Sequence, residues 1–150
     1  MHKGKQRKIP TPGTQKRHHL FGAYNWRTNE VIYMTAERKH SITFCLFLEH
    51  LIRSVTSSLP IVIVLDNASY HHSHISEAML AYFEDRSMVC WLPPYCSDLN
   101  PIERFWRHLK ETACANRLFK HISEIVDSVA KVLSILNDLT HPDRFLFSKT

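Results

Sequence analysis

The chain has no acidic residue before Glu30 and no long apolar run. Its most apolar stretch, "FCLFLEHLI", is interrupted by Glu49 and falls well short of the ~18 residues that a membrane-spanning helix needs. The basic start lacks the apolar segment of a secretory signal. The cysteines are scattered without a C-x2-C pair, which excludes the common zinc-module pattern and favours ordinary reduced thiols.

What is present indicates one packed domain with a basic surface. Hydrophobic residues make up 44% of the 150 positions and aromatic residues 11%, a composition typical of a globular core. The 19 Lys and Arg residues outnumber the 14 Asp and Glu residues, and a formal charge of +5 favours polyanionic partners. We expect a basic arm over residues 1–19, either solvated or lying on a phosphate backbone, and a folded domain over residues 20–150.

The hydrophobic spacing predicts an alternation of strands and helices. "LFGAYNW" and "EVIYMTA" are expected to form a hairpin, and Trp26 to pack against it. "IVIVLD" is apolar throughout, as in a central strand that is covered on both faces. The expected order is hairpin, helix with Ser41 as a possible cap, strand, helix through "SHISEAMLAYFEDR", strand "MVCWL", helix after Asn100 and a last helix around 122–139. This order predicts an α/β layered domain with a mixed sheet.

Two carboxylates stand at positions where a strand or a helix begins or ends. Asp66 ends "IVIVLD", and the carboxyl ends of strands are where open α/β sheets bind ligands. An Asp-Asn pair also commonly starts a turn by bonding its own backbone, so both interpretations stay open. Glu103 follows Asn100 and Pro101 in the arrangement of a helix cap, where its side chain would reach back to the cap's N–H.

The pair is more informative than either acid alone. If the two strands lie side by side, Asp66 and Glu103 converge on one rim of the sheet. Mg²⁺ and Mn²⁺ prefer carboxylate oxygens and keep water or substrate phosphate in their other positions. We therefore expect a divalent-metal site. A zinc site among His71, His72 and His74 is a weaker alternative, since no cysteine or spaced partner accompanies them.

"IVIVLDNASYH" followed by "WLPPYCSDLNPIERFWRHLK" closely resembles two catalytic blocks of the DDE transposases, in the bacterial insertion-sequence branch of the mariner superfamily. The resemblance implies a ribonuclease-H-like fold that binds two divalent metals through an Asp, Asp, Glu triad, cuts transposon ends and joins them to target DNA. It makes Asp66 and Glu103 the second and third ligands. It also implies that Asn67, His71, Asn100 and Lys110 support those ligands or contact DNA, with His71 at the rim of the site.

The sequence departs from that family in two places. Cys96 and Ser97 stand where Ser and Pro are usual, which is a local change. The first Asp of the triad is missing, together with its strand and the helix-turn-helix domain that normally precedes it. That strand lies in the middle of the family's sheet, so the sheet is expected to be incomplete, with backbone groups left without partners. Met1 would then be an internal start, as in a gene fragment or a split gene.

These features lead to one main hypothesis and two alternatives. The main hypothesis is a transposase core for DNA cleavage and strand transfer in the bacterial cytoplasm at the nucleoid, inactive by itself. An upstream polypeptide with the first Asp and the helix-turn-helix would complete it, and a homodimer is left open. The alternatives are a non-catalytic remnant that binds DNA or interferes with the intact enzyme, and a different ribonuclease-H-like nuclease.

Overall fold

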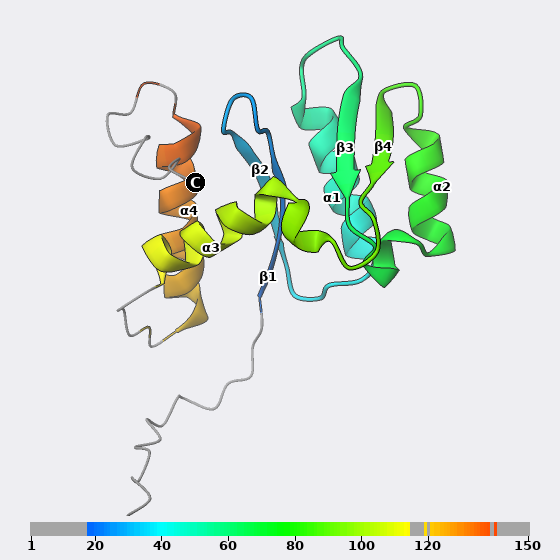
Figure 1. The fold of residues 1–150 in the computed structure, drawn as a ribbon. Coiled ribbons are helices and arrows are strands. Elements are labelled where there is room, and N and C mark those ends of the chain that lie inside the picture. The colour runs from blue at the N-terminus through cyan, green and yellow to red at the C-terminus, as the bar shows by residue number, and fades with distance from the viewer. Residues whose placement is uncertain (1–17, 115–118, 120, 139, 141–150) are drawn as a thin grey trace, which may run out of the picture.

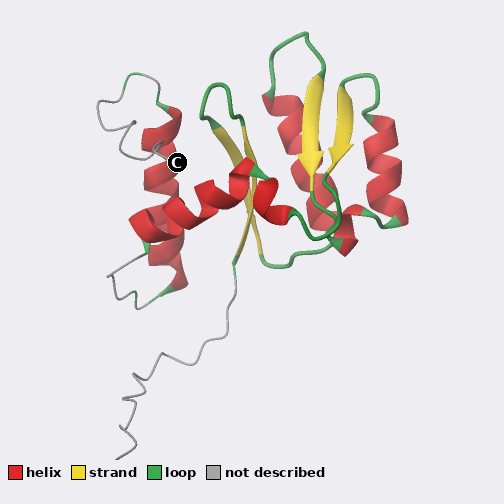
Figure 2. Cartoon of the chain, in the orientation of Figure 1, coloured by secondary structure: helices red, strands yellow, loops and turns green. Residues whose placement is uncertain are grey.

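The computed structural model describes residues 18–114, 119, 121–138 and 140, and its elements follow the expected order (Figures 1 and 2). They are β1 (His19–Tyr24), β2 (Val31–Ala36), α1 (Ser41–Ser54), β3 (Ile61–Leu65), η1 (Ser69–His71), α2 (His74–Tyr82), β4 (Ser87–Trp91), η2 (Ser97–Leu99), α3 (Pro101–Ala113) and α4 (Ile122–Asn137). Most of the expected basic arm lies outside the described residues. None of the described helices is long and apolar enough to cross a bilayer.

The α/β class is confirmed, and the described strands form two small sheets instead of one continuous mixed sheet. β1 and β2 form an antiparallel hairpin in which Tyr24 pairs with Val31. β3 and β4 are parallel, with Leu65 opposite Trp91. No described strand pairs with the second edge of β1 or of β3. This arrangement is consistent with an incomplete ribonuclease-H-like sheet.

The hairpin is apolar on both faces, as its residue types predict. Because successive side chains of a strand point to opposite faces, one set packs on α3 and α4 and the other on α1. The first set includes Tyr24 and Val31, in a cluster with Phe105 of α3 and Leu133 of α4. Phe21 represents the second set, since it packs in a cluster with residues of α1. The hairpin is therefore a middle layer between helices.

The sheet of β3 and β4 is covered on one face only, within the part of the chain that is described. Ile63 is buried with Leu48, Leu51 and Ile52 of α1, and α1 passes behind β3 in Figure 1. On the opposite face, Val62 is 58% exposed. The prediction of a strand covered on both faces is therefore wrong here, because α3 and α4 lie over the hairpin and do not extend across β3.

Two local details also differ from the sequence-based expectation. α1 begins one residue earlier than expected, since His40 is its cap: the His40 ring accepts from the Thr43 N–H and the Thr43 hydroxyl accepts from the His40 N–H. Trp26 is 72% exposed in the turn of the hairpin and does not pack against the strands. Both errors arise where a turn changes the direction of the chain and the strand or helix periodicity no longer applies.

Candidate active site

Asp66 lies directly after β3, at the edge of the sheet where the parallel strands β3 and β4 both end. Its carboxylate oxygen Oδ1 accepts a hydrogen bond from the N–H of Ala68 at 3.1 Å. The turn interpretation of Asp66 is therefore correct, and it does not conflict with the ligand interpretation. A carboxylate has about four acceptor positions, so one backbone bond orients it and leaves most of them available.

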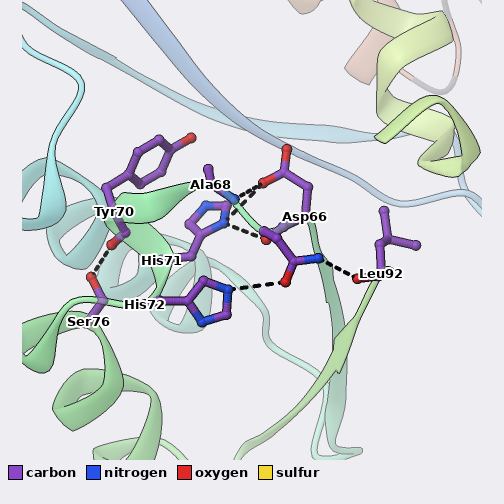
Figure 3. A network of polar contacts seen from close by, with 8 residues as sticks. Asp66, Ala68, Tyr70, His71, His72, Ser76 and Leu92 are labelled. Carbon is purple, nitrogen blue, oxygen red and sulfur yellow. Dashed lines mark hydrogen bonds and ion pairs between the residues drawn. The ribbon is translucent and has the colours of Figure 1, made fainter. Parts of the chain in front are cut away.

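The ring of His71 contacts both the carboxylate and the backbone carbonyl of Asp66. Its Nδ1 lies 3.2 Å from Oδ1 of Asp66 and 3.0 Å from the Asp66 carbonyl oxygen, as Figure 3 shows. The ring is only 7% exposed and packs against the rings of Phe44 and Tyr70 at centroid distances of 4.5 and 4.4 Å. Burial lowers the pKa of His71, although the contacts with Asp66 oppose that shift. A neutral ring whose Nδ1–H donates to Asp66 fits this geometry, so His71 faces the carboxylate and not solvent.

Glu103 reaches the same region from the first turn of α3. Asn100 is the cap of this helix, since its side chain accepts from the N–H of Ile102 at 3.3 Å, and Pro101 is the first helical residue. The expected bond from Glu103 back to the cap is not formed, because the Asn100 N–H donates to the carbonyl of Ser97 at 3.0 Å. Among the described residues the Glu103 carboxylate makes no hydrogen bond or ion pair, which leaves its oxygens available for a ligand.

The position of α3 depends on a close contact with the hairpin. A Cβ added at Gly22 would lie 2.5 Å from Cη2 of Trp106, far inside van der Waals contact. Only glycine therefore allows the indole to lie on β1. Trp106 is one turn beyond Glu103, so this contact fixes the part of α3 that carries the carboxylate.

Asp66 and Glu103 line one cavity of about 170 Å³, as the pairing of the two acids predicted. Its walls come from β1, Lys39 and α1, the end of β3, the turn at Tyr70 and His71, and the first turns of α3. Tyr70 is half-buried there, and its pKa is raised to about 12 by burial, then by the charge of Asp66, then by that of Glu103. Both carboxylates are therefore close enough to the same phenol to affect its ionisation.

The donor set fits a hard cation only in part. Nowhere in the described residues do three His, Cys, Asp or Glu side chains group closely enough to hold a metal ion. Asp66 and Glu103 offer carboxylate oxygens, and Mg²⁺ is commonly bound through one or two carboxylates together with substrate phosphates. His72, one of the residues of the zinc alternative, contacts Asn67 instead, at 3.2 Å from Nε2 to Oδ1.

The remaining predicted residues occupy different surroundings. Asn67 is exposed and donates from Nδ2 to the carbonyl of Leu92 at 2.6 Å. Lys110 is exposed on α3, seven residues after Glu103 and thus on nearly the same side of the helix. The sequence alone did not indicate Gly22 or Tyr70 as parts of the site. Gly22 lacks a glycine-specific backbone angle, and its role depends on a residue far along the chain.

Comparison of the sequence with known proteins identifies a family. Residues 1–126 match the family described as DDE superfamily endonuclease. An uncharacterized 39 kDa protein of insertion element IS630 from Shigella sonnei is 25% identical over 135 residues, which cover 85% of this chain and 39% of that protein. The uncharacterized protein y4pE/y4sA of Sinorhizobium fredii is 32% identical over 74 residues, or 49% of this chain and 51% of that protein.

The chain thus spans two-fifths to about half of the length of these relatives. The match to the family model covers most of the chain, and the insertion-element relative supports the bacterial insertion-sequence branch. The resemblance that was inferred from the residues around Asp66 and Glu103 is confirmed. The chain belongs to the DDE superfamily of endonucleases.

Proposed function

We propose that this chain supplies two of the three carboxylates of a divalent-metal site that cuts DNA phosphodiester bonds and joins transposon ends to target DNA. The observation that carries the proposal is the convergence of Asp66 and Glu103 on one cavity, together with their joint effect on the pKa of Tyr70. Two carboxylates close to one phenol, at the edge where parallel strands end, are more than a turn and a helix cap require.

Asp66 and Glu103 would hold Mg²⁺ or Mn²⁺. When bound, such ions stabilise the attacking and leaving oxygens of an in-line phosphoryl displacement. The chain's own contribution is orientation. Asp66 is fixed by Ala68 and His71, while Glu103 is brought to the cavity by the cap at Asn100 and the Gly22–Trp106 contact.

Cations on α3 support DNA as the substrate. Arg107 and Lys110 are both exposed and follow Glu103 at four and seven residues, so the three side chains share one stripe of the helix. A DNA strand with its scissile phosphate at the carboxylates could extend along this stripe and place neighbouring phosphates on the two cations. The net charge of +5 favours the same partner, and association with the nucleoid would follow from it.

We propose that a third carboxylate comes from outside the described residues, among which no group of three ligands is found. The third carboxylate could be carried by a strand that pairs with the second edge of β1 or of β3, since no described strand pairs with either edge. Among the described strands, β1 pairs only with β2 and β3 only with β4, and residues of β1 and of β3 line the cavity that contains Asp66 and Glu103. A strand that pairs with either edge would bring its side chains to the two acids. We propose that an upstream polypeptide provides it. A homodimer stays a prediction.

The test is metal-dependent cleavage of duplex DNA that carries the ends of the element. The purified chain is assayed alone and together with the polypeptide encoded immediately upstream of Met1. We expect no cleavage by the chain alone and Mg²⁺-dependent cleavage by the mixture. Asp66→Asn or Glu103→Gln should reduce that cleavage about a thousandfold or more.

Asp98→Asn is the matched control, since Asp98 is an exposed acid in the loop before α3. It should leave cleavage unchanged. Strong cleavage by the chain alone that is lost in Asp66→Ala would show that no partner is needed. A mixture that shifts DNA on a gel, forms a complex and never cleaves would favour the alternative of a DNA-binding remnant, in accord with the incomplete ligand set.

A further inference from the structure

The ends of β3 and β4 are joined by a side chain as well as by the backbone. The last ladder bond runs from the N–H of Leu92 to the carbonyl of Leu65 at 2.8 Å. One step further, the side chain of Asn67 donates from Nδ2 to the carbonyl of Leu92 at 2.6 Å. The amide therefore continues the pairing after the backbone of β3 has turned away at Asp66.

Two aromatic side chains fix the orientation of that amide. Oδ1 of Asn67 lies 3.2 Å from Nε2 of His72, so the amide oxygen faces the ring and the amide nitrogen faces Leu92. The His72 ring stacks on Trp91 with 4.3 Å between centroids and 25° between planes. With its oxygen facing the stacked His72 ring, the amide presents its donor side to the Leu92 carbonyl.

The segment that starts at Leu92 leads to Glu103. Its other backbone bonds are internal turns, from Cys96 to Pro93, from Leu99 to Cys96 and from Asn100 to Ser97. Among the hydrogen bonds of the described residues, those of Leu92 are the ones that join this segment to the end of β3. A rotation at Leu92 would therefore be carried along the loop toward Glu103, whose carboxylate makes no hydrogen bond or ion pair with any described residue.

We infer that Asn67, held by His72 on Trp91, is a positioning residue that acts together with the packing of α3 to set the distance between the carboxylates of Asp66 and Glu103. It follows Asp66 directly in the chain, inside the turn that the Asp66–Ala68 bond closes, and its side chain bonds Leu92, where the segment that leads to Glu103 begins. The consequence for metal binding rests on the proposed function, whereas the bond across the two strand ends does not.

Hydrogen exchange of the 150-residue chain tests the bond directly. Asn67→Ala should speed exchange of backbone N–H groups over residues 95–103 about fivefold, the equivalent of one net hydrogen bond. His72→Phe keeps a ring on Trp91 and removes the donor, so it should give a smaller increase. His72→Gln, which restores an N–H, should approach the wild type. Asn25→Ala, an exposed asparagine of the hairpin turn, is the matched control and should leave these residues unchanged.

Mn²⁺ titrations of single and double variants test whether Asn67 affects metal binding through Glu103. Asn67→Ala should weaken Mn²⁺ binding about tenfold, as removal of a residue that orients a ligand does. In the Glu103→Gln background the same change should have no further effect, since the residue acts through Glu103. A merely destabilising substitution would instead weaken binding in both backgrounds.

The outcomes separate the two proposals. Unchanged exchange over residues 95–103 in Asn67→Ala overturns the positioning role, whatever the metal does. An equal loss of Mn²⁺ affinity in both backgrounds overturns it as well. If Asp66→Asn and Glu103→Gln bind Mn²⁺ as the wild type does, the proposed function fails, and the exchange measurement still decides whether Asn67 holds the loop.

Discussion

The two carboxylates belong to halves of the molecule that are built differently. Asp66 lies in the half made of α1, β3, α2 and β4, whose contacts join segments that follow one another in the chain. Glu103 lies in the half made of the hairpin, α3 and α4, where the first strands meet the last helices. The side chain of Asp66 is oriented by neighbours two and five residues away, whereas Glu103 is placed by the packing of its whole helix.

One site can therefore combine a ligand that is oriented by residues close to it in the chain with a ligand that is positioned by residues far away in the chain. A local turn orients Asp66 even if the rest of the domain shifts. Glu103 depends on contacts with residues some eighty positions earlier, such as Gly22. Substitutions far from the cavity should therefore disturb Glu103 more than Asp66.

The largest expected effect on stability concerns Asn137, which joins α4 to β2. Its side chain accepts from the N–H of Val31 and donates to the carbonyl of Val31, both at 2.8 Å. Asn137→Ala leaves both backbone groups of a residue that is 2% exposed without these partners. Each such group costs about 1–3 kcal/mol, so urea denaturation should show a loss of roughly 2–4 kcal/mol in the free energy of unfolding.

Asn67→Ala gives the matching measurement in the other half. This asparagine also bonds a backbone carbonyl, but it is exposed, so water can replace it. Its removal should cost less than about 1 kcal/mol of unfolding free energy. Equal losses of unfolding free energy in Asn137→Ala and Asn67→Ala would contradict the view that long-range side-chain bonds matter more in the Glu103 half.

The largest effect on stability after that of Asn137 concerns Gly22. Gly22→Ala places a methyl group against Trp106, and the resulting overpacking should cost about 1–3 kcal/mol in the free energy of unfolding. Because α3 has to move, Mn²⁺ affinity should fall as well. The double variant Gly22→Ala, Trp106→Phe removes the clashing atom and should recover part of both losses. If Trp106→Phe gives no recovery, the contact does not position α3.

The sequence predicted the Asp66 half more completely than the Glu103 half. Apolar runs and 3.6-residue spacing were enough for β3, β4 and α1, because their partners are close in the chain. The spacing in the sequence of α2 favoured one face made of Ile75, Met79, Tyr82 and Phe83. Met79 and Phe83 are partly buried and pack on the core, as expected, whereas Ile75 and Tyr82 are 51% and 76% exposed and Ser76 is buried instead.

The long-range contacts of the hairpin with α3 and α4 had no local signal, in contrast to the Asn100 cap of α3. The Gly22–Trp106 approach and the Asn137–Val31 bonds both join the first quarter of the chain to its last third. Glycine and asparagine at those positions look like ordinary strand and helix-end residues until the fold brings their partners to them. Asp66 and Glu103 could nevertheless be paired from the sequence, because the ends of parallel strands share an edge.

The smallest expected effect is a change in the pKa of Tyr70, which depends on a carboxylate from each half of the molecule. Burial, Asp66 and Glu103 together raise the pKa of Tyr70 to about 12. Asp66→Asn should lower that pKa, because the phenolate no longer meets the negative charge, and Glu103→Gln should lower it by less. Glu77→Gln, an exposed acid of α2, is the control. NMR of ¹³C-labelled tyrosine measures the pKa of Tyr70 in each variant. An unchanged pKa in Glu103→Gln would show that this carboxylate does not lie near Tyr70.

The most direct test of the account is a crystal structure of the chain grown with Mn²⁺, with data collected at the manganese absorption edge. We predict an anomalous peak in the cavity, within coordination distance of a carboxylate oxygen of Asp66 and one of Glu103, that disappears in Glu103→Gln. Manganese bound elsewhere, or a cavity in which the two carboxylates point away from each other, would contradict the claim that they share a cation.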